Sequence, residues 1–149
     1  MAEPKRIGGQ GAALDVNLVT PRGVVAHEAT DGLTAPGEQG EFEVLPGHVP
    51  FLTALRPGVL TIGDRTRARY AVSQGYLRID TSGAVEVLVD EAMAAADVDV
   101  DVARADLKSA EAELVTWGDK PTDGDWQNLR HRAGWAQARL AARHAASPH

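Results

Sequence analysis

The chain of 149 residues contains no cysteine, and this absence excludes several kinds of chemistry. A disulfide framework, a thiol nucleophile and a metal or cluster held by cysteine are all ruled out. Aromatic residues make up only 5% of the chain, so its core must be built mainly from valine, leucine, isoleucine and alanine. The formal net charge of −6 lacks the basic excess of a nucleic-acid-binding protein, and no nucleic-acid partner is expected.

Long apolar runs are also missing. No stretch approaches the ~20 apolar residues that a membrane-spanning helix requires, and no secretory signal opens the sequence. Apolar residues account for 44% of the chain and charged residues for 24%, which is an ordinary globular balance. The composition therefore predicts a soluble intracellular protein with one domain, or a small domain plus an appendage. Any association with a membrane is expected to come through a partner.

Residues 14–93 carry the pattern of β-strands. Apolar and polar residues alternate, as in Leu14, Val16 and Leu18, and short apolar runs recur about every ten residues between turns. No helical stripe separates these runs, which argues against a parallel α/β sheet. We predict an antiparallel all-β sandwich or barrel over residues 14–93, preceded by a flexible tail over residues 1–13.

The apolar period becomes helical over residues 99–145, beyond a connector at residues 94–98. Asp99 is the predicted N-cap of the first helix, and a turn-rich connection leads to a second helix that begins near Asp123. Residues 146–149 form a short tail. The two helices are expected to pair as an antiparallel hairpin, with Trp117 and Trp126 meeting beside the connection. The two apolar stripes are Ala103, Leu107, Ala110, Leu114 and Trp117, and Trp126, Leu129, Ala133, Ala136 and Leu140.

The two predicted helices carry opposite charges. Residues 99–115 have a net charge of −3, and residues 124–149 have a net charge of +3. Each exposed ion pair contributes only a few tenths of a kcal/mol, but the sign pattern favours the antiparallel arrangement. The fold class is therefore predicted as an N-terminal β-sandwich followed by a C-terminal two-helix hairpin.

Residues 40–58, with the sequence GEFEVLPGHVPFLTALRPG, closely resemble the signature of the epsilon subunit of the F-type, proton-translocating ATP synthase. Further similarities follow in the family's order, and together they cover about residues 14–145. They are LDV at residues 14–16, YAVSQGYL at 70–77, the strand at 85–90 and DVDVARA at 99–105. The sequence departs from the family's pattern at Glu43 and Gln74, where glycine is frequent.

The resemblance implies a non-catalytic subunit of the central stalk. Such a subunit joins the gamma subunit to the ring of c subunits, so that torque from proton flow reaches the alpha/beta catalytic head. Residues 14–93 would bind gamma and the c ring, with Glu41 and His48 at this interface. No cofactor is required. The implied location is peripheral, on the cytoplasmic face of the bacterial plasma membrane, with the membrane reached only through the c ring.

The run Pro46-Gly47-His48-Val49-Pro50 predicts a rigid surface loop, because each proline fixes its backbone and removes a hydrogen-bond donor. We expect His48 and Glu41 to lie on one exposed end of the β-domain. The alternative role for His48 is to cap its own loop by hydrogen bonding.

No catalytic site is apparent in the sequence. Ser73 and Ser82 lack the context of an activated nucleophile, and the histidines lack the spacing of metal ligands. Glu41 and Glu43 share one strand face and could hold a metal or a proton, although a solvated face is the favoured interpretation. A further hypothesis for the function is a small β-sandwich hydrolase, and it requires that the isolated chain turn over a substrate.

Residues 100–105 resemble the ATP-binding motif of some epsilon subunits. Asp101 and Arg104 lie on one helical face, and an arginine can fork onto a phosphate group. Arg139 matches one of two arginines that ATP-binding members carry on the second helix, while Trp135 replaces the other. The resemblance thus implies ATP as a regulatory ligand at Asp101, Arg104 and Arg139. The alternative is a local salt bridge between Asp101 and Arg104. A free-standing ATP-sensing module is the alternative function for the whole chain.

The resemblance also implies that the extended hairpin can insert into the catalytic head and inhibit ATP hydrolysis. Basic residues of the second helix would then meet acidic residues of a beta subunit. Trp135 lies off the hairpin seam, and it either anchors that interface or packs against the β-domain when the hairpin is folded. The implied inhibitory residues are Arg130, Arg132, Trp135, Arg139 and Arg143.

Overall fold

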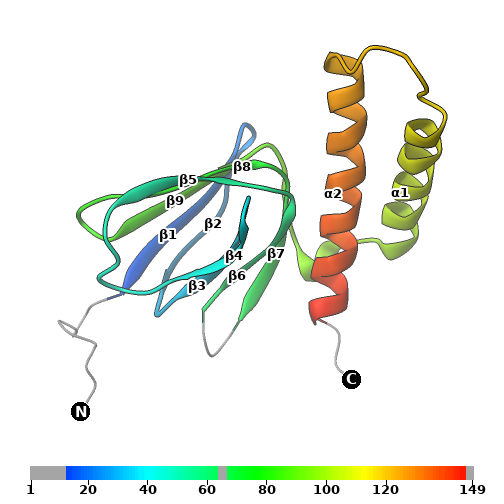
Figure 1. The fold of residues 1–149 in the computed structure, drawn as a ribbon. Coiled ribbons are helices and arrows are strands. Elements are labelled where there is room, and N and C mark those ends of the chain that lie inside the picture. The colour runs from blue at the N-terminus through cyan, green and yellow to red at the C-terminus, as the bar shows by residue number, and fades with distance from the viewer. Residues whose placement is uncertain (1–12, 64–66, 147–149) are drawn as a thin grey trace.

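A computed structural model describes residues 13–63 and 67–146. It contains a β-domain followed by two helices that stand beside one end of that domain (Figure 1), which confirms the predicted fold class. The tails predicted at residues 1–13 and 146–149 fall outside the described residues, apart from Ala13 and Ala146.

The β-domain consists of short strands, most of them five to eight residues long. Their bounds are β1 (Leu14–Thr20), β2 (Gly23–Thr30), β3 (Leu33–Gly37), β4 (Gly40–Val44), β5 (Phe51–Leu55), β6 (Gly58–Ile62), β7 (Ala68–Val72), β8 (Gly75–Ile79), β9 (Ala84–Val89) and β10 (Ala92–Ala94).

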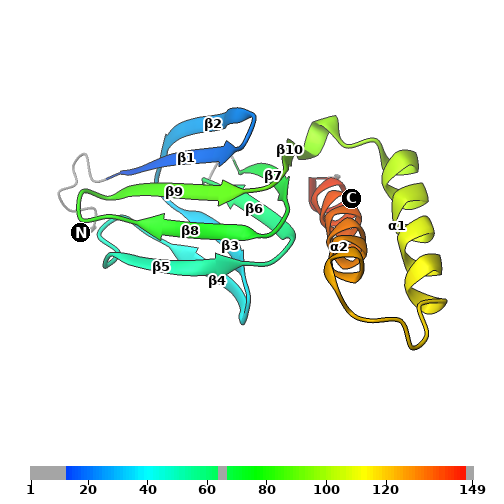
Figure 2. The ribbon, with the colours of Figure 1, turned by 90° about the horizontal axis from the view of Figure 1, so that it is seen from above.

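The strands form two layers that share one hydrogen-bonded order, β10-β7-β6-β3-β5-β8-β9-β1-β2, with β4 paired to β3. One layer contains β2, β1, β9, β8 and β5, which lie side by side in Figure 2. β3 joins the two layers, because it pairs with β6 at Leu33 and Thr34 and with β5 at Gly37.

The antiparallel prediction is wrong for one pair of strands. β1 and β9 run parallel, from Asp15 opposite Ala84 to Val19 opposite Leu88, whereas the other pairs in the described residues are antiparallel. The alternation of apolar and polar residues looks the same in either direction, so it could not reveal this pairing. A second difference is β3, to which the sequence analysis assigned no strand.

Alternate residues of both layers point inward and form the core. Valine and leucine dominate it, as the scarcity of aromatics predicted, while Phe42 and Phe51 lie partly buried at its edge with ring centroids 6.0 Å apart. Gly75 has no room for a side chain, because a Cβ there would collide with the Leu88 carbonyl. The largest fully buried side chains are Leu14, Leu18, Leu33, Leu55, Leu60, Ile62, Leu77, Val16, Val44, Val72, Val85 and Val87.

Both helices begin at capping aspartates. A short 3₁₀ helix, η1 (Ala95–Asp97), leads to α1 (Val100–Val115), and Asp99 Oδ1 accepts a hydrogen bond from the Val102 amide at 3.1 Å, which confirms the predicted N-cap. α2 (Gly124–Ala146) follows Asp123, whose Oδ1 accepts from the Asp125 amide at 3.0 Å.

The helices pack through small residues. Ala103, Ala110 and Ala136 are fully buried, and Leu129 closes the end of the seam near the connection. The predicted contact between Trp117 and Trp126 is wrong. The Trp117 indole donates to the carbonyls of Lys120 and Pro121, both at 3.1 Å, because α1 ends before this residue and the ring closes the connection instead. Trp126 lies 5.1 Å from the Arg130 guanidinium.

α2 has a second buried face, which the single predicted stripe did not include. Ala138 and Ala142 pack with Ala71 and Ala95, and Val59 and Trp135 complete this cluster. Trp135 therefore packs against the β-domain in the folded hairpin, which is one of the two roles predicted for it.

Gly134 permits a close approach of α2 to the β5–β6 turn. A Cβ at this position would lie 2.9 Å from the Pro57 Cγ, which is too close for an ordinary contact. Both groups are rigid, because one belongs to a helix backbone and the other to a proline ring.

Replacing Gly134 by alanine is therefore expected to loosen the docked hairpin by about 1–3 kcal/mol while leaving the β-domain folded. Amide hydrogen exchange of α2 measures this, and faster exchange is expected over residues 130–146. Gly124→Ala is the matched control, because open space surrounds that glycine in the same helix. Equal exchange in both variants would show that the Pro57 contact does not hold the hairpin.

Candidate protein-interaction surfaces

The loop that contains His48 is closed by local hydrogen bonds. Its backbone turns at Gly47 with φ 85°, and the His48 amide donates to the Leu45 carbonyl at 3.1 Å. His48 Nδ1 lies 2.9 Å from the Val49 carbonyl, so Nδ1 carries the proton and donates. The ring also lies 4.9 Å from the Phe51 ring. His48 therefore makes its hydrogen bonds within its own loop. The neighbouring Val49 side chain is 69% exposed.

Glu41 and His48 do not share one end of the β-domain, so that prediction is wrong. Glu41 pairs with Pro36 beside the β3–β4 turn, while His48 follows the other end of β4. There the loop borders a groove together with the β8–β9 turn at Thr81 and Ser82. From Glu41 to Val44, the last residue of β4, the strand spans roughly 10 Å.

The outer face of β4 carries acidic residues that are exposed. Glu41 and Glu43 lie on this face, as the alternation predicted, and border a groove with Thr34, Thr61 and Arg69. In the described part of the chain, no group of three or more histidine or acidic side chains could hold a metal ion. The arrangement is that of a solvated, charged surface.

A row of apolar side chains crosses the outer face of the five-stranded layer. The register places Ala54 opposite Tyr76, Tyr76 opposite Leu88, Leu88 opposite Val19, and Val19 opposite Val24. Tyr76 is 56% exposed, Leu88 44% and Val24 64%. We name this set of five residues the apolar row. Exposed apolar side chains that are cross-strand neighbours make this face a candidate for protein binding.

The sequence analysis missed the apolar row. Each member is an unremarkable apolar residue in its own strand, and the members come from five segments. Only the strand register brings them together, so no local motif could reveal them.

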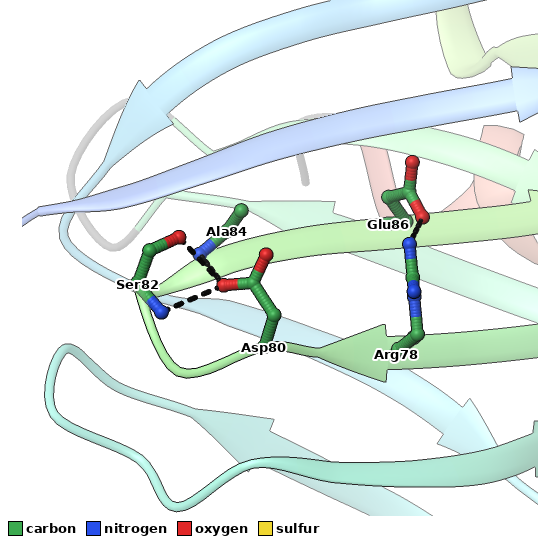
Figure 3. A network of polar contacts seen from close by, with 5 residues as sticks. All are labelled: Arg78, Asp80, Ser82, Ala84 and Glu86. Carbon is green, nitrogen blue, oxygen red and sulfur yellow. Dashed lines mark hydrogen bonds and ion pairs between the residues drawn. The ribbon is translucent and has the colours of Figure 1, made fainter.

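The next row on the same face is mostly polar, with the exposed Leu52 opposite Arg78. Arg78 forms an ion pair with Glu86 on the neighbouring strand (Figure 3). Beyond it, Asp80 Oδ1 accepts from the Ser82 hydroxyl at 2.6 Å and from the amides of Ser82 and Ala84 at 2.8 and 3.1 Å. These hydrogen bonds, the hydroxyl first, hold the pKa of Asp80 below its ordinary value of 3.8.

Because the folded state lowers this pKa, the ionised Asp80 stabilises the β8–β9 turn at neutral pH. The stabilisation is lost as the pH falls below 3.8 and through the lower folded pKa. Asp80→Ala is therefore expected to lower the urea midpoint at pH 7, with a smaller difference from the unaltered chain at pH 2. Glu38→Ala is a control for removing an exposed acid elsewhere. A difference that is the same at both pH values would contradict the role of ionised Asp80.

The residues implied in ATP binding are only partly assembled. Asp101 and Arg104 are exposed on α1, and within the described residues no ion pair joins them, so the local salt bridge is not formed. Arg139 is only 8% exposed, and its Nη2 donates to Asp106 Oδ2 at 2.9 Å. Its guanidinium also lies 5.3 Å from the Trp135 ring. Arg139 would have to exchange Asp106 for a phosphate group to bind ATP, and this set stays a prediction.

The four arginines implied in inhibition all have contacts within the folded hairpin. Arg132 pairs with Glu113 at 3.4 Å and Arg139 with Asp106, in agreement with the complementary charges of the two helices. Arg143 donates to the Ala96 carbonyl at 3.3 Å, and Arg130 lies over Trp126. In the folded state these arginines therefore contact groups of the hairpin or, for Arg143, of the connector before it.

Known proteins resemble this chain in sequence. Residues 13–95, more than half of the chain, match the family described as ATP synthase, Delta/Epsilon chain, beta-sandwich domain. The ATP synthase epsilon chain of Anaeromyxobacter sp. (strain K) is 37% identical over 132 residues, which cover 88% of this chain and 99% of that protein. This chain belongs to the epsilon-chain family of ATP synthase.

Other epsilon chains agree with this membership. That of Geobacter sulfurreducens is 41% identical over 115 residues, covering 76% of this chain and 81% of its own length. A chain in the Euglena gracilis mitochondrial ATP synthase structure, which contains OSCP, F1 and the c-ring, shares the fold with a TM-score of 0.71 and 21% identity. The aligned part covers 95% of this chain and 90% of that one.

Family membership makes this epsilon chain a subunit of the ATP synthase complex. The matched family domain ends at residue 95. The alignment with the Anaeromyxobacter relative is 132 residues long, so it must also include part of the helical hairpin. No helix within residues 13–63 and 67–146 has the length and apolar character needed to cross a membrane. Of the two departures from the family's pattern, Glu43 lies on the exposed face of β4, and Gln74 Nε2 donates to Asp90 Oδ2 at 2.6 Å.

Proposed function

We propose that this epsilon chain is a non-catalytic rotor subunit that couples rotation of the c ring, through gamma, to ATP synthesis in the alpha/beta head. The apolar row is the observation that carries this proposal. A surface of this kind on a rigid β-layer suits a permanent protein contact, whereas a catalytic site would need convergent reactive groups.

The apolar row is the proposed contact for gamma. Its central members Tyr76 and Leu88 are adjacent cross-strand neighbours, and the polar row with Arg78 and Glu86 borders it. An apolar centre with a polar rim is the usual composition of a stable protein interface.

Glu41 and His48 are the proposed contacts for the c ring and its junction with gamma. Since the two residues lie at opposite ends of β4, they contact different parts of that junction and can be tested separately. The proposed location is the cytoplasmic face of the bacterial plasma membrane, which the subunit reaches only through the c ring.

The hairpin is the proposed brake on ATP hydrolysis. Small residues fill its seam, so the folded and extended states are expected to differ by only a few kcal/mol. ATP, held by Asp101, Arg104 and Arg139, is the proposed regulatory ligand that would favour one state.

Co-purification tests the proposed function. A tagged chain, isolated from solubilised membranes, is expected to bring down alpha, beta, gamma and c subunits. Recovery without gamma, combined with measurable ATP affinity of the isolated chain, would favour the free-standing ATP-sensing module instead.

Reversing the charge at Glu41 is expected to weaken coupling. A partner surface that complements the Glu41 carboxylate is expected to be positive. Glu41→Lys would place a second positive charge against it, and like charges across an interface are unfavourable. ATP-driven proton pumping by membrane vesicles is expected to fall severalfold, while ATP hydrolysis and circular dichroism of the isolated chain stay unchanged. Glu38→Lys, in the β3–β4 turn, is the matched control. Unchanged pumping in Glu41→Lys would remove Glu41 from the proposed interface.

A further inference from the structure

The apolar row has polar side chains on both of its flanks, and the two flanks differ in charge. On one flank Arg78 and Glu86 form an ion pair, so their charges cancel (Figure 3). On the other flank Gln74 Nε2 donates to Asp90 Oδ2 at 2.6 Å. Because the amide is neutral, the Asp90 carboxylate keeps its charge, and this flank is negative.

The Gln74–Asp90 pair lies on the same outer face as the apolar row. Side chains alternate along a strand, so Gln74 shares the face of Tyr76, and Asp90 shares the face of Leu88. The Asp90 amide donates to the Gln74 carbonyl at 3.3 Å, which continues the pairing of β8 with β9 past the strand ends. A partner that covers the apolar row therefore reaches this pair as well.

Gln74 has an acceptor without a donor. Its Oε1 is buried and has no hydrogen-bond partner in the described residues. Turning the amide over does not help, because Oε1 would then face the Asp90 carboxylate, which offers no donor either. The Gln74 side chain is only half-buried, so rotation about its terminal bonds brings Oε1 to the surface beside Asp90. An orphaned acceptor at an outer face indicates a donor from another molecule.

The charges near the pair leave Asp90 uncompensated. Arg22 and Glu91 border the same small hollow as Asp90, and their charges are opposite. Within residues 13–63 and 67–146, no ion pair joins Asp90 to a basic side chain. Glycine is frequent at the position of Gln74 in the family's pattern, so relatives with glycine there lack this amide.

We propose that the Gln74–Asp90 pair binds an arginine side chain of gamma and thereby selects the gamma subunit that this chain accepts. The inference rests on the proposed contact of the apolar row with gamma. A guanidinium group has parallel N–H donors in one plane, so it donates to an Asp90 oxygen and to Gln74 Oε1 together. A gamma subunit with an acidic or apolar residue at this place leaves both acceptors without donors and binds more weakly.

Surface plasmon resonance with immobilised gamma and the full chain tests this contact. Asp90→Asn is expected to weaken binding on the order of tenfold, because it removes a charge-assisted hydrogen bond. Gln74→Leu keeps a similar size without the acceptor, and is expected to weaken binding about fivefold. Gln74→Glu is expected to tighten binding severalfold and to make it more sensitive to salt, because it places a second carboxylate against the guanidinium.

The matched control is Glu38→Gln, which removes an exposed acid in the β3–β4 turn and is expected to leave the affinity for gamma unchanged. Circular dichroism is expected to be the same for all four variants. Acetylating the lysines of gamma is expected to leave the effect of Asp90→Asn intact, and loss of that effect would overturn the assignment to arginine.

The sign of the Gln74→Glu effect separates recognition from a purely structural role. If the pair only stabilises the ends of β8 and β9, Gln74→Glu weakens gamma binding as the other two variants do, and the proposal is overturned. Unchanged affinity in Asp90→Asn would also overturn it, while the apolar row would remain the contact for gamma. Failure of the unaltered chain to bind gamma would instead refute the proposed rotor function, and this contact with it.

Discussion

Deletion of residues 99–149 is expected to raise ATP hydrolysis by the assembled enzyme and to leave ATP synthesis largely intact. The deletion removes the proposed brake, while the β-domain with its core and its apolar row is retained. If the inhibited state holds about 80–90% of the enzyme without a proton gradient, hydrolysis rises about five- to tenfold. The measurement is steady-state ATPase activity of purified complexes at low salt.

The contacts of the folded hairpin predict opposite effects on the inhibition of ATP hydrolysis for two kinds of variant. Asp106→Asn with Glu113→Gln removes the partners that hold Arg139 and Arg132 in the folded state, so it is expected to favour insertion and deepen inhibition. Neutralising Arg130, Arg132, Arg139 and Arg143 is expected to relieve inhibition as the deletion does. Trp135→Ala removes the ring that packs against the β-domain, so it is expected to loosen the folded hairpin and deepen inhibition. Relief of inhibition would instead show that the ring anchors the inserted state.

Added salt provides a further check, because it screens the exposed arginines and is expected to reduce the difference between the full-length and truncated enzymes. Equal rates of hydrolysis by both enzymes at low salt and without a proton gradient would contradict the proposed inhibition. The chain would then only couple rotation to synthesis.

Placing two charges in the apolar row is expected to abolish tight binding to gamma. Tyr76→Asp with Leu88→Asp would bury two unpaired carboxylates at the centre of the proposed interface, which weakens binding by at least about 100-fold. Both side chains point outward, so the β-domain is expected to stay folded. Surface plasmon resonance with immobilised gamma measures the affinity.

The polar row supplies the matched control for this experiment. Arg78→Gln with Glu86→Gln removes an exposed ion pair on the same two strands, and such a pair contributes little. Its effect on gamma affinity is expected to be less than about fivefold. Comparable losses in the two double variants would place the gamma contact elsewhere, and retained affinity in Tyr76→Asp with Leu88→Asp would refute the proposed surface.

The features that the sequence predicted correctly depend on interactions between neighbouring residues. Asp99 and Asp123 cap their helices because short acidic side chains reach the free amides of the first turn, an interaction within four residues of sequence. Two prolines enclose His48, and they predicted a loop at this place, where the strands β4 and β5 are separated. Complementary charges on the two helices predicted ion pairs between them, and the structure contains Arg132–Glu113 and Arg139–Asp106.

The sequence by itself determined the order of β-domain and hairpin, the helix starts and the family, because these depend on neighbouring residues or on a contiguous motif. Only the tertiary structure decided the parallel pairing of β1 with β9, the separation of Glu41 from His48, and the apolar row. It also decided that Trp135 packs against the β-domain and that Gln74 donates to Asp90. Each of these joins residues far apart along the chain, and strand register and helix docking set such distances, which alternation and helical period leave undefined.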